Sequence, residues 1–428
     1  MTKRTLVLGA AISGRAAVRL ARRLGHEVTV YDRDPAALSG FDAEIASASG
    51  EWDRALLDSH DLVVTSPGIP QHVDAIVDSR SAGIDFISEL EFAYRHLDAP
   101  CVAVTGTNGK TTVTAATADM LAASGIDAVA AGNIGVALSD VADSGHDLVV
   151  VEASSFQLQF VDSFHPKAAA ILNIAPDHLD WHGSYAAYAA AKRRIGERQT
   201  AADIIVYDRD DAGAIAAVSG LPAVAIPVSG TMRPQGGNGP VGDKLHIGPV
   251  TLERPQLDAA FTMDLTAAAT LAQHMGASAS AMDEVVAGFV PETHRRTVVG
   301  ERDGIVWVND SKATNPHAAL AAARAYPSVV LIAGGRNKGL DLSPLVGVES
   351  VRAVIALGEA SAELAVATQP GRFHQAESLA DAVAIAGDLA VAGDTVLLAP
   401  GCASFDMFED YRERGRVFSD LVARRMDN

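Results

Sequence analysis

The chain has 428 residues, of which 48% are hydrophobic and 20% are charged, as is usual for a globular protein of two to four domains. Its 34 basic and 53 acidic residues give a net charge of −19, which argues against DNA or an anionic membrane as the main partner. Two distant cysteines, Cys101 and Cys402, exclude a disulfide framework and a cysteine-rich metal site. No apolar run approaches the length of a membrane span, and we expect a cytoplasmic protein.

Short apolar runs rich in Val, Ile and Leu recur along the chain, and helix-like segments separate them. Such unbroken apolar strands indicate buried parallel sheets, so we predict an α/β protein. Functional groups in these folds lie where strands end and helices begin. The predicted strands are 5–9, 27–32, 61–65, 100–106, 147–152, 168–173, 203–208, 328–334, 351–358 and 394–400.

Two places in the chain read as joints between domains. One βα series ends near Asp98, and another begins there with its own glycine loop; a helical stretch ends near Glu292. We therefore predict three domains, which comprise residues 1–98, 99–292 and 293–428. The segment 229–250 is rich in Gly and Pro and is expected to form a surface excursion or a small β element.

The first predicted strand leads into a glycine loop, Gly9-Ala10-Ala11-Ile12-Ser13-Gly14, and then into a helix. The next strand ends at Asp32, where dinucleotide-binding folds place an acid on a ribose hydroxyl. Ala11 stands in the middle glycine position and would crowd a pyrophosphate. We therefore favour another nucleotide over NAD(P), with a purely structural turn as the remaining alternative. Gly68, after the third strand, would add a backbone amide to the same site.

The second glycine loop gives the strongest local signal in the chain. A buried strand ends in Gly106-Thr107-Asn108-Gly109-Lys110-Thr111-Thr112, and a helix follows. Backbone amides and the helix N-terminus hold an anion there, while the lysine reaches the β- and γ-phosphates and a hydroxyl reaches Mg²⁺. A strict P-loop has four residues between its glycines and this loop has two, but its context predicts ATP binding. The alternative is a glycine-rich turn that carries these residues by chance.

Metal ligands are expected near such a loop. Glu152 ends one buried strand, and His178 follows the next predicted strand, so we expect the two at adjacent strand ends. A carboxylate suits Mg²⁺, whereas a histidine ligand is less usual, and His178 alone would more often be structural. Lys192 lies in an alanine-rich helical run and would ordinarily be solvated. Only seven basic residues are lysines, which draws attention to those in Gly, Ser, Thr or Asn contexts.

Several motifs together resemble the Mur ligase family. The central part matches in Gly-Thr-Asn-Gly-Lys-Thr-Thr at 106–112, Gly-Asn-Ile-Gly at 132–135, Glu-Ala-Ser-Ser-Phe-Gln-Leu at 152–158 and Asn-x-x-x-Asp-His-Leu-Asp at 173–180. The later part resembles the branch of the family that adds D-glutamate, in segments 309–315, 334–338 and 400–406. The resemblance spans essentially all 428 residues, in the same order.

The resemblance implies a fold and a reaction. The N-terminal domain would be Rossmann-like and bind UDP, the central domain would be a P-loop-type ATPase with a parallel sheet, and the C-terminal domain would be a Rossmann-like α/β domain that binds the amino acid and closes on ATP. ATP would activate the carboxylate of UDP-N-acetylmuramoyl-L-alanine as an acyl phosphate, and the amine of D-glutamate would attack it, in cytoplasmic peptidoglycan precursor synthesis. A monomer is expected. A sibling Mur-type ligase, a folate polyglutamate ligase, a nucleotide-dependent dehydrogenase and a non-catalytic UDP-sugar-binding regulator are the alternatives.

Functional residues carry over from the resemblance by position. The catalytic residues would be Lys110, Glu152, His178 and Lys192. ATP would be bound by Gly106, Thr107, Asn108, Gly109, Lys110, Thr111, Thr112, His294, Arg295 and Asp310. Two Mg²⁺ sites would be held by Thr111, Glu152, His178 and Lys192, the last as a carbamate.

The resemblance also assigns the two other substrates. The UDP substrate would contact Ile12, Ser13, Asp32, Gly68, Asn133 and Ser154. D-glutamate would contact Lys312, Thr314, Lys338, Ser404, Phe405 and Tyr411, because a dicarboxylate needs cations or equivalent hydrogen-bond donors. One departure is notable: relatives carry asparagines around 261–266, one of which touches adenine, and Met263 and Thr266 stand here instead.

Overall fold

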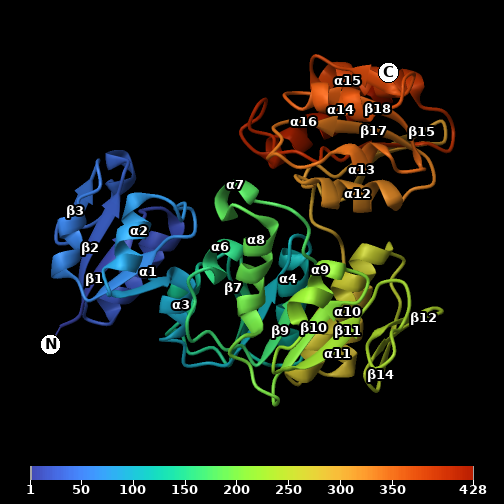
Figure 1. Ribbon diagram of the computed structural model, residues 1–428. Helices are drawn as coiled ribbons and strands as arrows, with labels where there is room; N and C mark the ends of the chain where they lie inside the picture. The colour runs from blue at the N-terminus through green and yellow to red at the C-terminus, as the bar shows by residue number, and fades with distance from the viewer. Residues whose placement is uncertain (1, 428) are drawn as a thin grey trace. The chain divides into compact units, whose positions relative to one another are not determined.

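The computed structural model describes residues 2–427, which form two compact units. The first unit contains the residues up to Ile174 and Trp181–Gly288, and the second contains Ala175–Asp180 and the residues from Phe289 onward. In each unit helices pack against the faces of largely parallel sheets (Figure 1). Among residues 2–427, no helix has both the length and the apolar character to cross a membrane.

The N-terminal sheet of the first unit is parallel, with strand order β3-β2-β1-β4-β5. Its strands are β1 (Arg4–Leu8), β2 (Glu27–Asp32), β3 (Ala46–Ser49), β4 (Leu62–Thr65) and β5 (Asp85–Ser88). Helices α1 (Ile12–Arg23) and α2 (Asp74–Ser81) and the 3₁₀ turns η1 (Pro35–Leu38) and η2 (Arg54–Ser59) connect them, and α3 (Glu89–Tyr94) follows β5. A Cβ on Gly14 would lie 1.8 Å from the carbonyl oxygen of Gly9, so only glycine lets α1 approach the loop this closely.

The central sheet is also parallel and has the order β11-β10-β9-β6-β8-β7. Its strands are β6 (Cys101–Thr105), β7 (Ala128–Gly132), β8 (Leu148–Glu152), β9 (Ala168–Ile171), β10 (Ile204–Asp208) and β11 (Val224–Val228). Because β6 lies between β8 and β9, the prediction that Glu152 and His178 follow adjacent strands is wrong. The glycine loop after β6 therefore leaves the sheet between the other two strand ends.

Helices and a small antiparallel sheet complete the first unit. The helices are α4 (Lys110–Ala123), α5 (Leu138–Val141), α6 (Ser155–Leu158), α7 (Leu179–His182), α8 (Tyr185–Arg193), η3 (Arg194–Gly196), α9 (Ala212–Val218), α10 (Ala259–His274) and α11 (Ala279–Ala287). The first two residues of α7, Leu179 and Asp180, belong to the second unit. The small sheet has the order β12 (Gly239–Val241), β13 (Lys244–Ile247) and β14 (Val250–Glu253). This sheet confirms the small β element expected in 229–250.

The second unit contains a sheet with the order β15-β16-β20-β17-β18-β19, in which only β15 runs antiparallel among the described strands. Its strands are β15 (Thr297–Arg302), β16 (Ile305–Asn309), β17 (Val329–Gly334), β18 (Val351–Leu357), β19 (Phe373–Gln375) and β20 (Thr395–Leu398). Its helices are α12 (Pro316–Arg324), α13 (Ser343–Val346), α14 (Ser361–Ala367), α15 (Leu379–Leu389) and α16 (Tyr411–Asp427).

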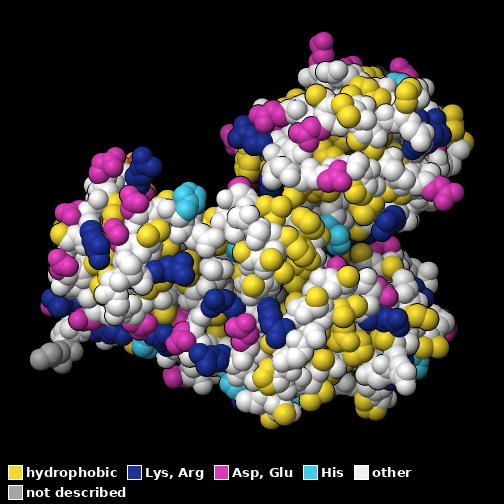
Figure 2. All heavy atoms as spheres, viewed as in Figure 1, with side chains coloured by type: hydrophobic (Ala, Val, Ile, Leu, Met, Phe, Trp, Pro, Cys, Tyr) yellow, Lys and Arg dark blue, Asp and Glu magenta, His cyan; other side chains and the backbone are white. Residues whose placement is uncertain are grey.

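All ten strands predicted from apolar runs are present, with ends that differ by no more than two residues. Most strands outside that prediction lie at sheet edges, namely β3, β5, β7, β11, β15 and β19. In β3, β5, β15 and β19 polar or charged residues break the apolar run, as is usual for partly exposed edge strands, whereas β7 and β11 carry no polar side chains. Acidic and basic side chains alternate over the face of each unit that Figure 2 shows, rather than gathering by sign.

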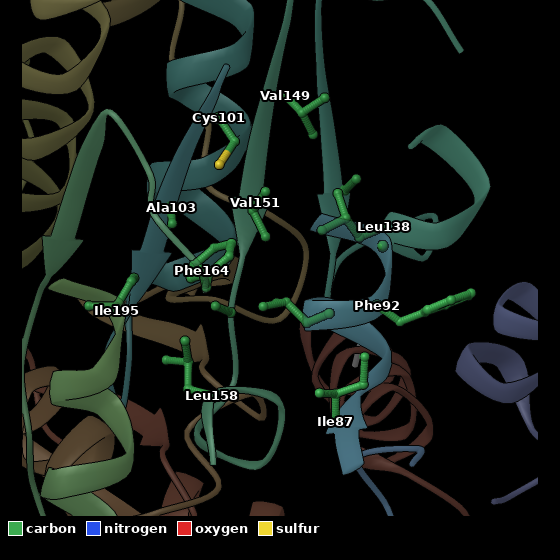
Figure 3. Close-up of a cluster of buried hydrophobic side chains, with 14 of the residues drawn as sticks. Ile87, Phe92, Cys101, Ala103, Leu138, Val149, Val151, Leu158, Phe164 and Ile195 are labelled. Carbon is green, nitrogen blue, oxygen red and sulfur yellow. The ribbon is translucent and has the colours of Figure 1, made fainter. Parts of the chain in front are cut away.

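The hydrophobic core of the first unit crosses the predicted joint at residue 98. One continuous cluster contains Ile87 and Phe92, which precede the joint, and Val151 and Phe164, which follow it. Figure 3 shows these side chains among the buried residues of β6, β8 and α3. Helix α3 is therefore packed into the core of the segment that follows it in the chain.

Glu91 of α3 fixes this packing through hydrogen bonds. Its fully buried carboxylate accepts bonds from the backbone amides of residues 162, 163 and 164, at 3.0, 2.9 and 3.1 Å. The Ser163 hydroxyl at 2.6 Å and Arg95 Nε at 2.9 Å donate to the same carboxylate. Five donors thus converge on one negative charge.

Replacing Glu91 by glutamine is expected to destabilise the first unit by about 3 kcal/mol, because an amide NH₂ would face donors and leave buried N–H groups unpaired. The measurement is the urea dependence of circular dichroism. The matched control is Glu27→Gln, an exposed glutamate of β2, which should change stability by less than about 0.5 kcal/mol. Equal stability of the two variants would contradict this role for Glu91.

Candidate functional site

The loop after β6 is held by the end of the neighbouring strand β9. The Thr107 amide donates to the carbonyl oxygen of Asn173 at 2.8 Å, and the Asn108 amide donates to Asn173 Oδ1 at 2.8 Å. Asn173 Nδ2 in turn donates to the Asn108 carbonyl at 3.1 Å. Asn173 therefore fixes the loop in the strand–loop–helix geometry that holds phosphates at a helix N-terminus.

Two lysines converge on the carbonyl oxygen of Gly106. Lys110 Nζ donates to it at 3.0 Å and to the Thr107 carbonyl at 3.0 Å, so this side chain curls over its own loop. Lys192 Nζ, at the end of α8, donates to the same Gly106 oxygen at 2.7 Å and lies 4.7 Å from the ring centre of Tyr188. Lys192 is 2% exposed, so the solvated-helix reading of this lysine is wrong. Solvent reaches the opposite face of α8, at Tyr185, Ala186 and Ala190.

Glu152 carries a buried carboxylate oxygen that has no hydrogen-bond partner among residues 2–427. Its Oε1 accepts a hydrogen bond from Asn133 Nδ2 at 2.8 Å, while Oε2 is buried and unpaired. Glu152 ends β8, next to the strand that carries the loop. A carboxylate oxygen left without a donor beside a phosphate loop is the donor type that Mg²⁺ prefers. Among residues 2–427 there is no cluster of three or more acidic, His or Cys side chains able to hold a metal, so phosphate oxygens or water would have to complete the coordination.

The other residues predicted near this loop have varied surroundings. Thr111 and Thr112 begin α4, and Thr112 is buried. The Ser154 hydroxyl donates to Gln157 Oε1 at 2.9 Å and caps α6, so it is already engaged. Asn133 is exposed at the end of β7.

Helix α10 places the carboxylate of Asp264 against the loop after β6. Asp264 lies between Met263 and Thr266, the two residues that differ from the asparagines of relatives. The Thr266 hydroxyl donates to the Thr262 carbonyl at 2.7 Å, and Met263 is buried. Asp264, between them, is 3% exposed, and its Oδ1 lies 2.4 Å from where a Cβ on Gly109 would stand. The residue of this helix that lies against the loop is therefore Asp264, which the motif comparison had not singled out.

The first glycine loop borders a pocket of about 440 Å³ in the N-terminal part. Asp32 and Gly68 line it, as predicted for a nucleotide site, while Ile12 is 75% exposed and Ser13 is partly buried at the start of α1. Asp32 Oδ2 accepts a hydrogen bond from the Ala10 amide at 2.8 Å, which ties the acid to the loop.

Aromatic residues that no motif indicated form one wall of the same pocket. The rings of Tyr31 and Trp52 meet edge to face with centres 5.0 Å apart. Trp52 Nε1 donates to Asp78 at 2.9 Å, which fixes the indole. An aromatic wall opposite a glycine loop suits a flat base beside a phosphate or sugar. Trp52 lies in an irregular segment, so periodicity gave no signal for it.

In the second unit three loops predicted to bind the amino acid follow three neighbouring strands. The loops begin at Asp310 after β16, at Ala399 after β20 and at Gly335 after β17, and these strands are adjacent and parallel. Backbone hydrogen bonds from the Gly401 amide to the Ala313 carbonyl and from the Gly334 amide to the Pro400 carbonyl join the loops. Segments 309–315, 334–338 and 400–406 thus form one continuous edge.

The residues assigned to D-glutamate lie on or beside this edge, but both lysines already have acidic partners. Lys338 Nζ donates to Asp177 Oδ1 at 3.0 Å, and Lys312 Nζ pairs with Glu292. Ser404 is buried, and Phe405 is 64% exposed. Thr314 follows Lys312 in the first loop, and Tyr411 begins α16.

Asp177 is a residue of this edge that no motif assignment included. It is 4% exposed and also accepts a hydrogen bond from Asn315 Nδ2 at 3.3 Å. The charges of Lys338 and His178 and their hydrogen bonds outweigh its burial and lower its pKa below the usual range. His178, next to it, has a positive φ of 52° and groups with the second unit, whereas Glu152 and Lys192 belong to the first.

The nucleotide residues predicted in the second unit are close together in the fold. His294 Nδ1 lies 3.1 Å from Asn309 Nδ2, and the His294 carbonyl accepts a bond from the Lys312 amide. Burial lowers the pKa of His294. Asp310 is 5% exposed and accepts a bond from the Arg296 amide at 3.2 Å, while Arg295 lies in the turn between. The strand-end loop of β16 therefore brings together the segments around 294 and 310.

Three family descriptions match successive parts of the chain. "Mur ligase MurD-like, N-terminal domain" matches residues 3–88, "Mur ligase middle domain" matches 104–227, and "Mur ligase, glutamate ligase domain" matches 294–402. Together they cover each of the three sheets that carry the sites described above.

Relatives also match this chain over nearly its whole length. The UDP-N-acetylmuramoylalanine–D-glutamate ligase of Frankia casuarinae is 39% identical over 98% of this chain and 94% of its own length. The ligase of the same name from Myxococcus xanthus is 38% identical over 98% of each chain. Among solved structures, MurF from Acinetobacter baumannii superposes with a TM-score of 0.64 at 16% identity, over 99% of this chain and 93% of that one.

Proposed function

The chain belongs to the Mur ligase family, and from this premise we propose that it adds D-glutamate to UDP-N-acetylmuramoyl-L-alanine with ATP. The observation that carries the proposal is the loop after β6, braced by Asn173 and flanked by the unpaired oxygen of Glu152 and by buried Lys192. Family members are ATP-dependent ligases that use Mg²⁺. A dehydrogenase would leave this loop and segment 309–315 without a role, and a non-catalytic regulator would be expected to have lost Lys110, Glu152 or His178, all of which are present.

The reaction needs charge neutralisation above all. A carboxylate becomes a good electrophile only when its oxygen is phosphorylated, and the anionic substrate must meet the γ-phosphate of ATP. Lys110 and Thr111 would hold the β- and γ-phosphates of ATP. Mg²⁺, when bound at Glu152, would offset phosphate charge. The substrate carboxylate would take the γ-phosphoryl group of ATP and ADP would leave; the D-glutamate amine would then attack the acyl phosphate, and the amide would form as the nitrogen loses a proton and phosphate leaves.

Further assignments belong to the same proposal. Two Mg²⁺ sites would use Thr111, Glu152, His178 and a carbamate on Lys192, and Gly106–Thr112 with His294, Arg295 and Asp310 would bind ATP. The UDP part would occupy the pocket at Asp32 and Gly68, with Ile12 and Ser13 at its loop and Asn133 and Ser154 nearer the reacting carboxylate. Lys312, Thr314, Lys338, Ser404, Phe405 and Tyr411 would receive D-glutamate. Domain boundaries at 98 and 292, a cytoplasmic location and a monomeric state complete it.

The test is phosphate release from ATP and Mg²⁺ with UDP-N-acetylmuramoyl-L-alanine and one amine at a time. Release is expected with D-glutamate and not with L-glutamate, L-lysine or meso-diaminopimelate. The site at the edge of β16, β20 and β17 is expected to select an amino acid that has two carboxylates and the D configuration. Release with a different amine alone would assign the chain to a sibling ligase. Absence of release with every amine would overturn the proposed reaction.

A further inference from the structure

Among residues 2–427, the largest fully buried side chain is a cation, Arg414 in α16. It is 2% exposed and lies behind the edge formed by segments 309–315 and 400–406. A buried guanidinium ordinarily has a carboxylate partner, because an unpaired charge in the interior is costly. Among residues 2–427, no carboxylate forms an ion pair with Arg414.

The partners of Arg414 are neutral oxygens on two separate loops. Its Nε donates to Ser311 Oγ at 2.9 Å, one terminal nitrogen donates to the Ser311 carbonyl at 2.9 Å, and the other donates to the Cys402 carbonyl at 3.3 Å. The Ser311 hydroxyl in turn donates a hydrogen bond to the Tyr411 carbonyl at 2.8 Å. One planar side chain thus links the loop after β16, the loop after β20 and the start of α16.

The residues next to these contacts are those proposed to receive D-glutamate. Lys312 follows Ser311, and Ser404 stands two positions after Cys402. A shift of either loop would move these side chains relative to each other. The guanidinium, with its fixed geometry, sets that separation more rigidly than a flexible side chain would.

The charge balance of this edge points the same way. Glu292 compensates the charge of Lys312, and Asp177 compensates that of Lys338. The nearby Asp406 accepts a bond from the Glu359 amide and forms no ion pair with Arg414. Burial lowers the pKa of Arg414 to about 10, so it stays protonated at neutral pH. The positive charge of Arg414 is therefore offset only at longer range, by Asp406, and an arriving dicarboxylate would offset it further.

We propose that Arg414 is a positioning residue for the amino-acid site, which holds the 311 and 402 loops in register and favours a dianionic acceptor. The proposal rests on the proposed function, since it concerns how that function selects D-glutamate. Arg414 is not a catalytic residue, because it touches loop oxygens and not the reacting atoms.

The experiment compares the KM for D-glutamate with the KM for ATP in the full-length enzyme. Arg414→Ala is expected to raise the D-glutamate KM about 10- to 100-fold, while the ATP KM changes less than about threefold, because hydrogen bonds to a charged group on two loops are lost. Arg414→Lys keeps the charge but cannot bridge both loops, and is expected to fall between wild type and alanine. Millimolar guanidinium should partly restore the D-glutamate KM of Arg414→Ala.

Arg416→Met is the matched control, an exposed arginine two positions along the same helix, and both KM values should stay at wild-type levels. If Arg414→Ala does not fold, Ser311→Ala provides a second test. This variant removes the hydroxyl oxygen that accepts the hydrogen bond from Arg414 Nε, and it should raise the D-glutamate KM about 3- to 10-fold. Equal rises in the two KM values, or an unchanged D-glutamate KM in these variants, would overturn the proposal. An inactive wild type would instead overturn the proposed function itself.

Discussion

Replacing Lys192 with alanine is expected to lower phosphate release by about 10²- to 10³-fold, the range found when one group that stabilises transition-state charge is removed. The side chain is 2% exposed, and its nitrogen lies 2.7 Å from the Gly106 carbonyl, inside the phosphate loop. If the proposed ATP site is correct, a change there acts where the γ-phosphate and its metal would bind, and it leaves the outer surface untouched. The measurement is steady-state phosphate release with saturating ATP and both other substrates.

Chemical rescue then separates the two roles that Lys192 can have. If the lysine acts as a carbamate, its added carboxylate supports the metal, and acetate or another short carboxylate should restore part of the activity of Lys192→Ala. If it acts as an ammonium group, methylamine should restore activity and acetate should not. Rescue by amine alone would therefore disprove the carbamate while keeping Lys192 in the site.

The control for this series is Lys244→Ala. Lys244 lies on β13, pairs with Glu253 at the surface and is remote from the loop in the chain. Its loss should leave phosphate release within about twofold of wild type, since exposed ion pairs contribute little. A similar loss in both lysine variants would indicate a general effect of removing positive charge, and would contradict a local role for Lys192.

The positions of the loops proposed to carry the chemistry could be predicted from the sequence, because these loops follow buried parallel strands. The strands that end before the 106 loop, at Glu152 and before Asn173 are unbroken apolar runs, and each was found at its expected place. The same holds for β17 and β20, whose ends carry Lys338 and Ser404 in their following loops. In these folds the pattern alone indicates which end of a strand is functional.

The order of the strands could not be predicted in the same way. Nothing in the runs themselves indicates that β6 lies between β8 and β9, because every strand of a buried parallel sheet is equally apolar. Glu152 and His178 were therefore placed at adjacent strand ends, and they are not. Pairing between strands depends on packing across the whole sheet, which a local pattern does not contain.

Burial of charged side chains was the other feature that local patterns did not indicate. Lys192 and Arg414 both lie in helices whose sequence suggests solvent exposure, yet each is 2% exposed. Their partners come from distant loops: the Gly106 carbonyl lies 86 positions before Lys192, and Ser311 lies 103 positions before Arg414. Asp177 is similar, since its partner Lys338 lies 161 positions away. Such contacts exist only once the sheets have formed.

Gly109 is expected to be the least replaceable residue of the phosphate loop, and Gly109→Ala should lower phosphate release by at least about 10²-fold. Its φ of 88° lies in the left-handed region, where an alanine costs roughly 1–2 kcal/mol. An added Cβ would also lie 2.4 Å from Asp264 Oδ1 and 3.0 Å from Leu172 Cδ1, so the loop or α10 must move. Either movement displaces Lys110, the next residue.

The matched variant is Gly125→Ala, just beyond the other end of the same helix α4. Gly125 has a φ of 83°, close to that of Gly109, but a Cβ there would meet nothing within 4 Å. Both variants thus carry a similar backbone strain, and only Gly109→Ala adds the collision with Asp264 and Leu172. Both should lose stability in urea unfolding, whereas only Gly109→Ala should lose phosphate release and protection by ATP against thermal unfolding. If Gly125→Ala loses activity to the same degree, backbone strain in α4 and not the shape of the loop controls the site.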